Sequence, residues 1–204
     1  EHVVVENQQG KSLGVAYVNP QSLICARLMS HDERPIDVNF LKKRIKSALA
    51  LRETLYEHPC YRLIYGESDL LPGLVVDRFG DHLSVQLNTA GMDAMRDIII
   101  EALVRMLQPQ SILLRNDAAV RKLEGLELEV VTAYGEVPDE VELIENGVRF
   151  LAPLAAGQKT GWFYDQRPNR EWLRTLAPGK RVLDVFSYVG SFGVQAAVFG
   201  ASDV

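Results

Sequence analysis

The stretch VLDVFSYVGSFGVQAA, residues 182–197, decides how the C-terminal part of the chain folds. It opens on hydrophobic residues that predict a buried parallel strand over residues 181–186. Asp184 lies near the carboxyl end of that strand, where open α/β sheets bind ligands. Gly190 then permits a tight turn into a helix predicted over residues 193–199, whose N-terminus favours an anion. The stretch predicts the first strand, turn and helix of a doubly wound sheet, with a nucleotide-type pocket.

Two common nucleotide-binding motifs are missing from this stretch. The dinucleotide fingerprint G-x-G-x-x-G does not fit, since Phe186 and Tyr188 stand where glycines are needed, and the sequence holds no G-x-x-x-x-G-K-[ST] loop. Asp184 followed by Gly190 is also the pattern of an ordinary core strand that ends in a turn. From these residues alone, a cofactor pocket and a plain structural turn both remain open.

The residues before this stretch predict the start of the same module. Residues 136–140 contain Pro138 and three acids, which is typical of a linker. Two short apolar runs then flank Asn146-Gly147, a pair that tolerates the positive φ of a type I′ turn and predicts a β-hairpin. A helix is predicted over residues 166–176. A new module therefore begins near residue 138.

The central part of the chain predicts a small α+β domain. Asp37 is suited to cap a helix that ends near Tyr56, with Lys42, Lys43 and Lys46 on its polar surface. The remaining expected elements are a strand at 61–65, a hairpin of 73–78 and 83–87 turning at Gly80-Asp81, a helix with an apolar stripe from Met92 to Met106 stopped by Pro109, a strand at 111–114 and a short helix at 118–123.

The first residues predict three short strands, at 3–5, 13–18 and 23–28, separated by turn residues. Three strands of this length do not make a stable sheet by themselves, so we expect the domain to begin upstream of residue 1.

Composition limits the class of protein. With 204 residues, of which 47% are hydrophobic and 24% charged, the chain can bury a core, and no apolar run is long enough for a membrane helix. The net charge of −5 argues against binding nucleic acid through bulk positive charge but allows a local basic face. Cys25 and Cys60 are expected to be reduced thiols of a cytoplasmic protein, and His31, His58 and His82 show no spacing for a metal site.

Four motifs in order along the chain carry a resemblance to a known family. The segment Asp184–Phe192 resembles the first cofactor motif of class I RNA methyltransferases, in the variant with Phe-Ser-Tyr-x-Gly. The other three are GQKTGWFYDQRPNR at 157–170, GESDLLPGLVVDRFGDHLSVQ at 66–86 and R-x-L-E-G-L at 121–126. Together they are similar to the S-adenosylmethionine-dependent large-subunit rRNA 5-methylcytosine methyltransferases. The first thirty residues resemble the end of a PUA barrel.

The resemblance implies an α/β and α+β fold of three parts. These are a C-terminal remnant of a PUA-like β domain over 1–34, a middle α+β domain over 35–137, and the hairpin and first β-α unit of a Rossmann-like methyltransferase domain over 138–204. It implies S-adenosyl-L-methionine as cofactor and large-subunit ribosomal RNA as substrate. The residues that it places at the cofactor are Asp184, Phe186, Ser187, Tyr188 and Gly190, with Lys159, Thr160 and Arg167 at the rim of the pocket.

The family's mechanism requires a Cys nucleophile that attacks C6 of the cytosine. Neither Cys25 nor Cys60 falls at a position that the family uses, so this Cys is expected beyond Val204, no catalytic residue is assigned in this chain, and the chain by itself is expected to be inactive. A guanine-N7 rRNA methyltransferase, which shares a similar Thr-Gly-x-x-x-Asp-x-R stretch, and a non-catalytic RNA-binding module remain as alternatives.

Two further questions stay open at this point. Lys159, Arg167 and Arg170 are either solvated charges near a helix start or contacts for a phosphate or carboxylate. A single strand of a parallel sheet would leave the apolar residues of 182–186 and 194–198 uncovered, which predicts a homodimer or an exchange of segments between copies.

Overall fold

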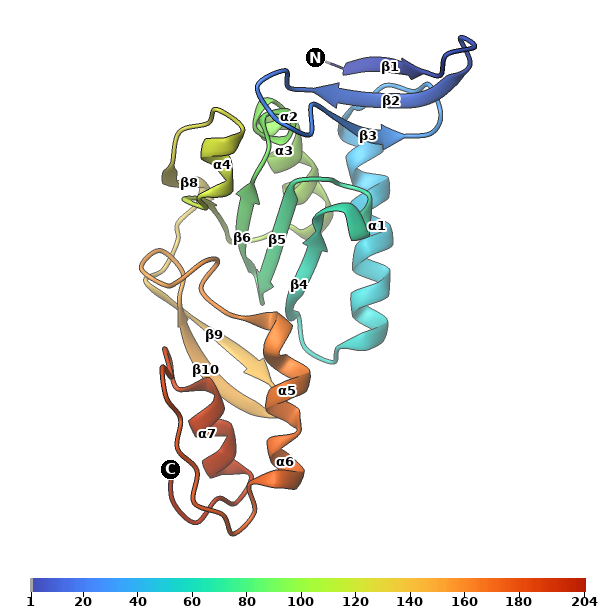
Figure 1. The fold of residues 1–204 in the computed structure, drawn as a ribbon. Coiled ribbons are helices and arrows are strands. Elements are labelled where there is room, and N and C mark those ends of the chain that lie inside the picture. The colour runs from blue at the N-terminus through green and yellow to red at the C-terminus, as the bar shows by residue number, and fades with distance from the viewer. Residues whose placement is uncertain (1) are drawn as a thin grey trace. The chain divides into compact units, whose positions relative to one another are not determined.

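The computed structural model describes residues 2–204, which divide into two compact units, the first ending at Pro138 and the second beginning at Asp139 (Figure 1). Both units mix strands and helices, so the mixed α and β fold class is confirmed. Among the described residues, no helix is long and apolar enough to cross a membrane. Each unit is described by itself.

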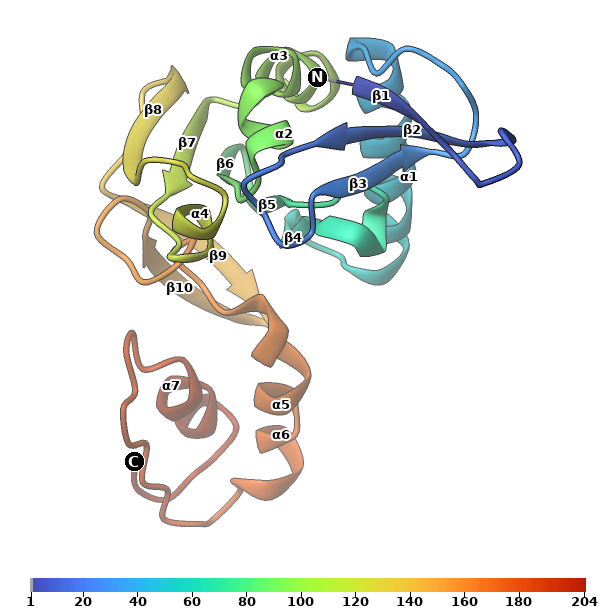
Figure 2. The same cartoon turned by 45° about the horizontal axis from the view of Figure 1, so that its top comes forward.

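The first unit opens with an antiparallel sheet of order β1-β2-β3, drawn in blue in Figure 2. Its strands are β1 (His2–Glu6), β2 (Ser12–Val18) and β3 (Ala26–Ser30). The third strand begins later than expected because residues 19–25 form a loop, closed by a hydrogen bond from the Asn19 N–H to the Cys25 carbonyl at 2.8 Å. Tyr17 and Met29 are buried in the same apolar core as the residues that follow, so these strands share the core of the first unit.

The centre of the first unit is a mixed sheet of order β4-β5-β6-β7-β8. Its strands are β4 (Cys60–Tyr65), β5 (Leu74–Phe79), β6 (His82–Leu87), β7 (Ser111–Asn116) and β8 (Glu129–Gly135). Strands β6 and β7 pair in parallel, and the other neighbours pair antiparallel. The short 3-10 turn η1 (Gly66–Asp69) follows β4.

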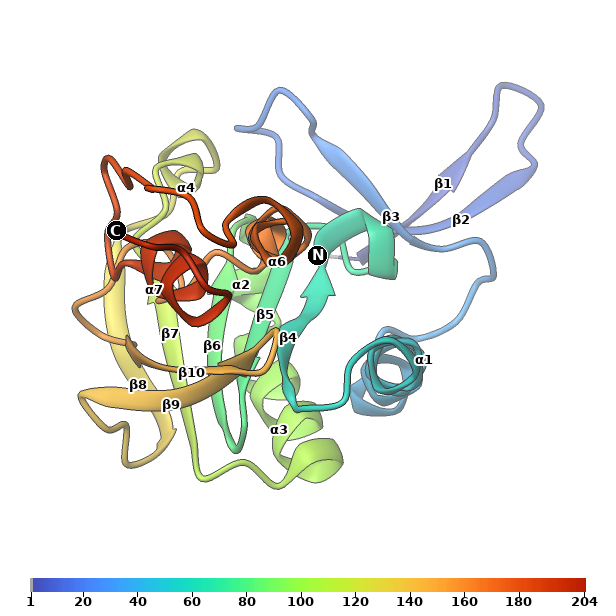
Figure 3. The ribbon, with the colours of Figure 1, turned by 90° about the horizontal axis from the view of Figure 1, so that it is seen from below.

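One face of this sheet is covered by α1 (Val38–Leu55) and α3 (Arg96–Leu107), which lie together beside it in Figure 3. Asp37 caps α1 as expected, since its carboxylate accepts a hydrogen bond from the Phe40 N–H at 2.8 Å. Apolar residues of α1, α3 and the sheet, among them Leu41, Ile45 and Ile99, form one buried cluster.

Two elements of the first unit differ from expectation. The helix predicted from Met92 to Met106 is broken at Met95 into α2 (Ala90–Ala94) and α3. The edge strand β8 was not predicted, although its Val130-Val131-Thr132 run has the β-branched residues that favour strands. The short helix α4 (Val120–Leu123) precedes it.

The second unit begins with the antiparallel hairpin of β9 (Glu140–Glu145) and β10 (Val148–Pro153). Asn146 and Gly147 have φ values of 55° and 78°, so the predicted type I′ turn is confirmed. The helix expected over 166–176 is divided at Trp172 into α5 (Arg167–Glu171) and α6 (Leu173–Leu176), after the 3-10 turn η2 (Tyr164–Gln166). The last helix is α7 (Ser191–Val198).

The buried strand predicted over residues 181–186 is wrong for this structure. Its β pairing within the described residues consists of a single parallel bridge between Arg181 and Asp203. A parallel strand needs neighbours on its edges to satisfy its backbone groups, and residues 2–204 supply no further partner to this segment. Leu183 is therefore 86% exposed and Phe186 100% exposed, instead of lying in a core.

Candidate functional site

The turn between Asp184 and α7 is built around positive φ angles. Phe186, Tyr188 and Gly190 have φ values of 62°, 56° and 70°. Such conformations are costly for residues other than glycine, and they concentrate at ligand-binding segments. Gly190, the residue that the sequence singled out for this turn, is the N-cap residue of α7.

Asp184 is tied to the first turn of α7. Its Oδ2 accepts a hydrogen bond from the Gly193 N–H at 2.9 Å, which satisfies one of the backbone donors that a helix N-terminus leaves open. Gly193 fits because a Cβ there would lie 3.3 Å from that same Oδ2. The carboxylate is therefore brought to the positive end of the helix dipole.

Phe186 and Ser187, by contrast, are not brought to the other candidate residues. Both are exposed, and the ring of Phe186 is fully accessible. The Ser187 carbonyl accepts a hydrogen bond from the Gly190 N–H at 2.9 Å and closes the turn. These two residues present their side chains to solvent.

Tyr188 connects this turn to the segment after the hairpin. Its hydroxyl accepts a hydrogen bond from the Gln158 N–H at 3.0 Å and donates to the Gly161 carbonyl at 3.3 Å. Gly157 allows this approach, since a Cβ there would meet the Pro153 carbonyl oxygen at 2.2 Å and the Tyr188 hydroxyl at 2.6 Å. The two motifs that the sequence suggested as partners, at 157–170 and 184–192, are thus joined in space by one side chain.

Lys159 and Thr160 lie in the segment that Tyr188 holds. Lys159 has a φ of 52°, and its Nζ lies 4.6 Å from the centre of the Phe163 ring, in a cation–π contact. The same ring meets Tyr188 edge to face, with centroids 5.8 Å apart. Thr160 is buried, and its hydroxyl lies 3.5 Å from the Trp162 carbonyl. Lys159 remains exposed and able to meet an anion.

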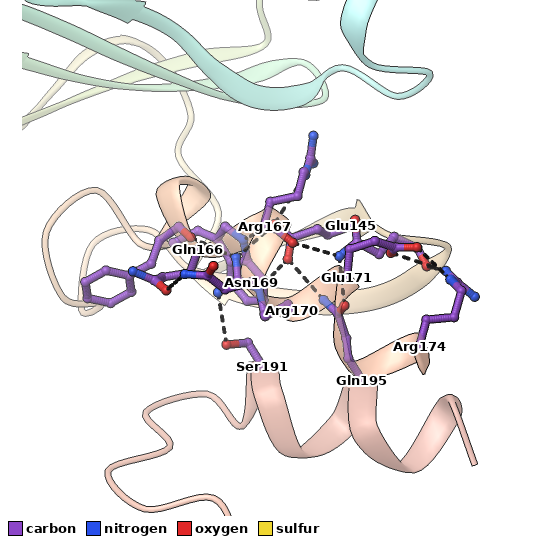
Figure 4. Close-up of polar contacts among 12 residues, drawn as sticks. Glu145, Gln166, Arg167, Asn169, Arg170, Glu171, Arg174, Ser191 and Gln195 are labelled. Carbon is purple, nitrogen blue, oxygen red and sulfur yellow. Dashed lines mark hydrogen bonds and ion pairs between the residues drawn. The ribbon is translucent and has the colours of Figure 1, made fainter. Parts of the chain in front are cut away.

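A buried polar cluster is centred on Glu145, at the end of β9 (Figure 4). The carboxylate of Glu145 is inaccessible to solvent. It accepts hydrogen bonds from Trp162 Nε1 at 2.9 Å, from Arg170 Nη2 at 2.9 Å and from Gln195 Nε2 at 3.0 Å. One carboxylate thereby joins the hairpin, α5 and α7.

The cluster decides the role of two arginines that the sequence left open. Arg170 is buried against Glu145 and contacts the face of Trp162, with the guanidinium carbon 5.0 Å from the ring centre. Arg167 Nε lies 3.4 Å from a Glu145 oxygen, with its side chain 14% exposed. The interpretation of these arginines as solvated charges is therefore wrong. Sequence reasoning missed Glu145 and Gln195, because a Glu in a hairpin and a Gln in a helix are ordinary surface residues unless their partners are known.

The donors at the start of α7 fit an anionic group. The first hydrogen bond of the helix runs from the Val194 N–H to the Gly190 carbonyl at 2.8 Å, so the helix itself does not satisfy the N–H groups of Ser191 and Phe192. Arg170 Nη1 lies 3.5 Å from the Ser191 hydroxyl, and the Phe186 ring in the preceding turn is fully accessible. Backbone donors at a helix N-terminus suit a carboxylate, and an accessible aromatic ring suits a flat ring system.

Metal chemistry and disulfide chemistry find no support in the part of the chain that the structure describes. No group of three or more His, Cys, Asp or Glu side chains there is placed to hold a metal ion. Cys25 is exposed and Cys60 is buried.

Comparisons with known proteins match both ends of the chain. Residues 111–204 match a family described as S-adenosylmethionine-dependent methyltransferase, and residues 1–31 match a PUA-like domain. Ribosomal RNA large subunit methyltransferase I from Vibrio cholerae is 40% identical over 208 residues, which cover 100% of this chain and 52% of that protein.

Solved structures that resemble this chain are also methyltransferases by their descriptions. A protein from Streptococcus mutans, described as a SAM-dependent methyltransferase, superposes with a TM-score of 0.83 and 26% identity, over 99% of this chain and 53% of that chain. A methyltransferase crystallised in complex with SAH gives a TM-score of 0.85 and 26% identity, over 99% of this chain and 52% of that chain. The chain spans about half the length of the relatives that it matches.

Proposed function

Because this chain belongs to the S-adenosylmethionine-dependent methyltransferases that carry a PUA-like domain, we propose that the whole protein methylates C5 of a cytosine in large-subunit ribosomal RNA. The observation that carries the proposal is the 40% identity to a ribosomal RNA large subunit methyltransferase over the full length of this chain. A ribosomal substrate implies that the protein works in the cytoplasm.

The proposed cofactor site is the turn from Asp184 to Gly190 with the start of α7. The Ser191 and Phe192 N–H groups would receive the carboxylate of the methionine moiety, while the accessible ring of Phe186 offers a face for the adenine. Asp184 and Gly190 hold the backbone of the turn in place. When bound, S-adenosylmethionine supplies a methyl group on a positively charged sulfur.

The rim of the proposed site comes from the segment that Tyr188 holds. Lys159 is exposed there and would contact an anionic group of the cofactor or the RNA, while Thr160 is buried and supports the backbone of the segment. Arg167 acts through its contact with Glu145, so we assign it a positioning role. Ser187 is assigned to the turn through its carbonyl.

Methylation at C5 of cytosine needs a thiolate that adds to C6, because C5 is not nucleophilic until that bond forms. We assign this role to neither Cys25 nor Cys60, and we expect the nucleophile in sequence that follows Val204. This chain alone is therefore expected to transfer no methyl groups.

A methyl-transfer assay tests the proposed function. Unmodified large-subunit ribosomal RNA and labelled S-adenosylmethionine are incubated with this chain and, in parallel, with the longest polypeptide that its gene encodes. The RNA is then digested and its nucleosides are identified by mass spectrometry. We expect 5-methylcytidine with the longer polypeptide alone.

The other outcomes of this assay separate the alternatives. Label in 7-methylguanosine would replace the cytosine proposal with the guanine-N7 enzyme. RNA binding without label in either sample would leave a non-catalytic RNA-binding module. Turnover by the 204-residue chain itself would overturn the assignment of the nucleophile.

A further inference from the structure

A basic hollow lies in the first unit where β3 leads into α1. It has a volume of about 320 Å³, and Leu28 and Leu70 are among its walls. The polar and charged residues that line it are Ser30, His31, Asp32, Arg34, Lys43 and Arg44.

The charge around this hollow is opposite to that of the chain. Residues 42–46 of α1 read Lys-Lys-Arg-Ile-Lys, whereas the chain as a whole carries a net charge of −5. Asp32 is the one acidic residue among those that line the hollow, and its carboxylate is already paired with Arg34. Lys43 and Arg44 therefore give the hollow an excess of positive charge, which concentrates anions there.

Arg44 is held in place before any ligand arrives. Its guanidinium lies over the ring of Phe40, 5.1 Å from the centroid, and one of its nitrogens donates to the Met29 carbonyl at 3.5 Å. A guanidinium carries five N–H donors, so this contact leaves most of them available. A pre-positioned arginine loses little side-chain freedom when it binds a phosphate.

A second hollow adjoins the first and is mostly apolar. Its volume is about 270 Å³, and it shares Leu28 and Leu70 with the basic hollow. Ile24 and Pro72 complete its apolar lining, and Arg27 and Glu67 at its edge lie 3.7 Å apart as an ion pair. A basic and an apolar hollow that share a wall match the two halves of a nucleotide.

We propose that these two hollows bind a single-stranded segment of RNA, with a backbone phosphate at Lys43 and Arg44 and an unstacked base against Ile24, Leu28 and Leu70. That the nucleic acid is RNA rests on the proposed function. Single-stranded rather than duplex RNA is specified because a base held in a helix cannot enter an apolar hollow.

The test measures binding of a fluorescent 12-nucleotide single-stranded RNA to the 204-residue chain by anisotropy, over a range of salt concentrations. Lys43→Glu is expected to weaken binding about tenfold and to lower the salt slope by about 1, since one phosphate contact is lost. Ile24→Ser, at an exposed position, is expected to weaken binding about fivefold with an unchanged slope, because a base contact releases no counterions.

Lys11→Glu is the matched control, since it makes the same charge change at an exposed lysine that lines neither hollow. It is expected to bind within about twofold of the unchanged chain. Equal losses for Lys11→Glu and Lys43→Glu would overturn the proposal, as would tighter binding to an RNA duplex or binding to anionic lipid vesicles in place of RNA. None of these results depends on methyl transfer, so the proposal can fail while the proposed function stands.

Discussion

At the scale of single residues, Glu145 holds the second unit together. Its buried carboxylate receives hydrogen bonds from Trp162, Arg170 and Gln195, which come from three different segments. A buried charge of this kind is tolerated because its partners replace the water that it lost, and removing one partner leaves the other charge uncompensated.

Glu145→Gln is expected to lower the free energy of unfolding of the second unit by about 3 kcal/mol, because Arg170 then stays buried without its anion. Both tryptophans of the chain, Trp162 and Trp172, lie in this unit, so their fluorescence in a urea titration reports on it. Glu142→Gln on the same strand is the control, since its ion pair with Arg149 is exposed, and we expect a change within about 0.5 kcal/mol. Equal effects of the two changes would refute the role of Glu145.

Glu124 is the corresponding buried carboxylate of the first unit. Burial by itself would raise the pKa of Glu124, but hydrogen bonds from Asn19, Ser22, the Ala90 N–H and Arg27 outweigh it and hold the pKa below its ordinary value of 4.5. As the pH falls, Glu124 is therefore protonated in the unfolded chain at a higher pH than in the folded chain. The stability that Glu124 contributes is fully present above about pH 4.5 and is lost as the pH falls below that value.

Glu124→Gln is expected to make the free energy of unfolding depend less on pH, because an amide does not titrate. The free energy of unfolding is measured by circular dichroism in urea at a series of pH values from 7 to 3. The difference between the unchanged chain and Glu124→Gln should be largest at pH 7 and shrink below about pH 4.5. Glu127→Gln, at an exposed position nearby, should show no such trend, and a constant difference for Glu124→Gln would contradict the account.

At the scale of elements, α7 and the turn before it carry the proposed cofactor site. The Asp184 carboxylate accepts a hydrogen bond from the Gly193 N–H, as an N-cap side chain does, although Asp184 lies outside the helix. The turn is therefore part of the helix N-terminus rather than a loose connection.

Asp184→Ala is expected to destabilise this helix start by about 1 kcal/mol, because the Gly193 N–H loses its acceptor. Hydrogen exchange at the Gly193 amide measures the effect directly and should become faster. Asp184→Asn keeps an acceptor oxygen and should retain most of the protection. If Asp184→Ala left exchange at Gly193 unchanged, the contact would have no structural role.

Local chemistry explains which elements could be predicted from sequence. Asp37 at the start of α1 and Asn146-Gly147 in the hairpin act on their own neighbours, so their effects are visible in a short stretch. The predicted strand over 181–186 failed because strand formation depends on partners elsewhere in the sheet, which residues 2–204 do not supply. The Glu145 cluster was hidden for the same reason, since its members are up to 50 residues apart. The motif residues Asp184 and Tyr188 were singled out from the sequence, but the hydrogen bonds that they make were not predicted.

At the scale of the whole molecule, the second unit exposes apolar residues from the segment predicted as a strand and from α7. Leu183, Val185, Phe186 and Val198 are all more than half exposed. Large exposed apolar side chains favour association. We propose that copies of the chain associate through this segment, as a homodimer or by exchange of segments.

Light scattering over a range of protein concentrations tests the association, and we expect the average mass to rise toward that of a dimer. Phe186→Ser should return the chain to a monomer, since it removes a fully exposed ring. Leu23→Ser is the control, because Leu23 is equally exposed but lies in the first unit. A monodisperse monomer that binds no dye for exposed apolar surface would contradict the proposal.

Calorimetric titration with S-adenosylhomocysteine tests the central claim most directly, because it asks whether the turn from Asp184 to Gly190 holds the cofactor. It is carried out on this chain and on the longest polypeptide that its gene encodes, with Phe186→Ala as the variant that removes the exposed ring. We expect saturable heat at one site in the longer polypeptide and at least about fivefold weaker binding in Phe186→Ala, since one aromatic contact of this kind is worth on the order of 1 to 3 kcal/mol. The absence of heat in both polypeptides, or binding that Phe186→Ala leaves unchanged, would contradict it.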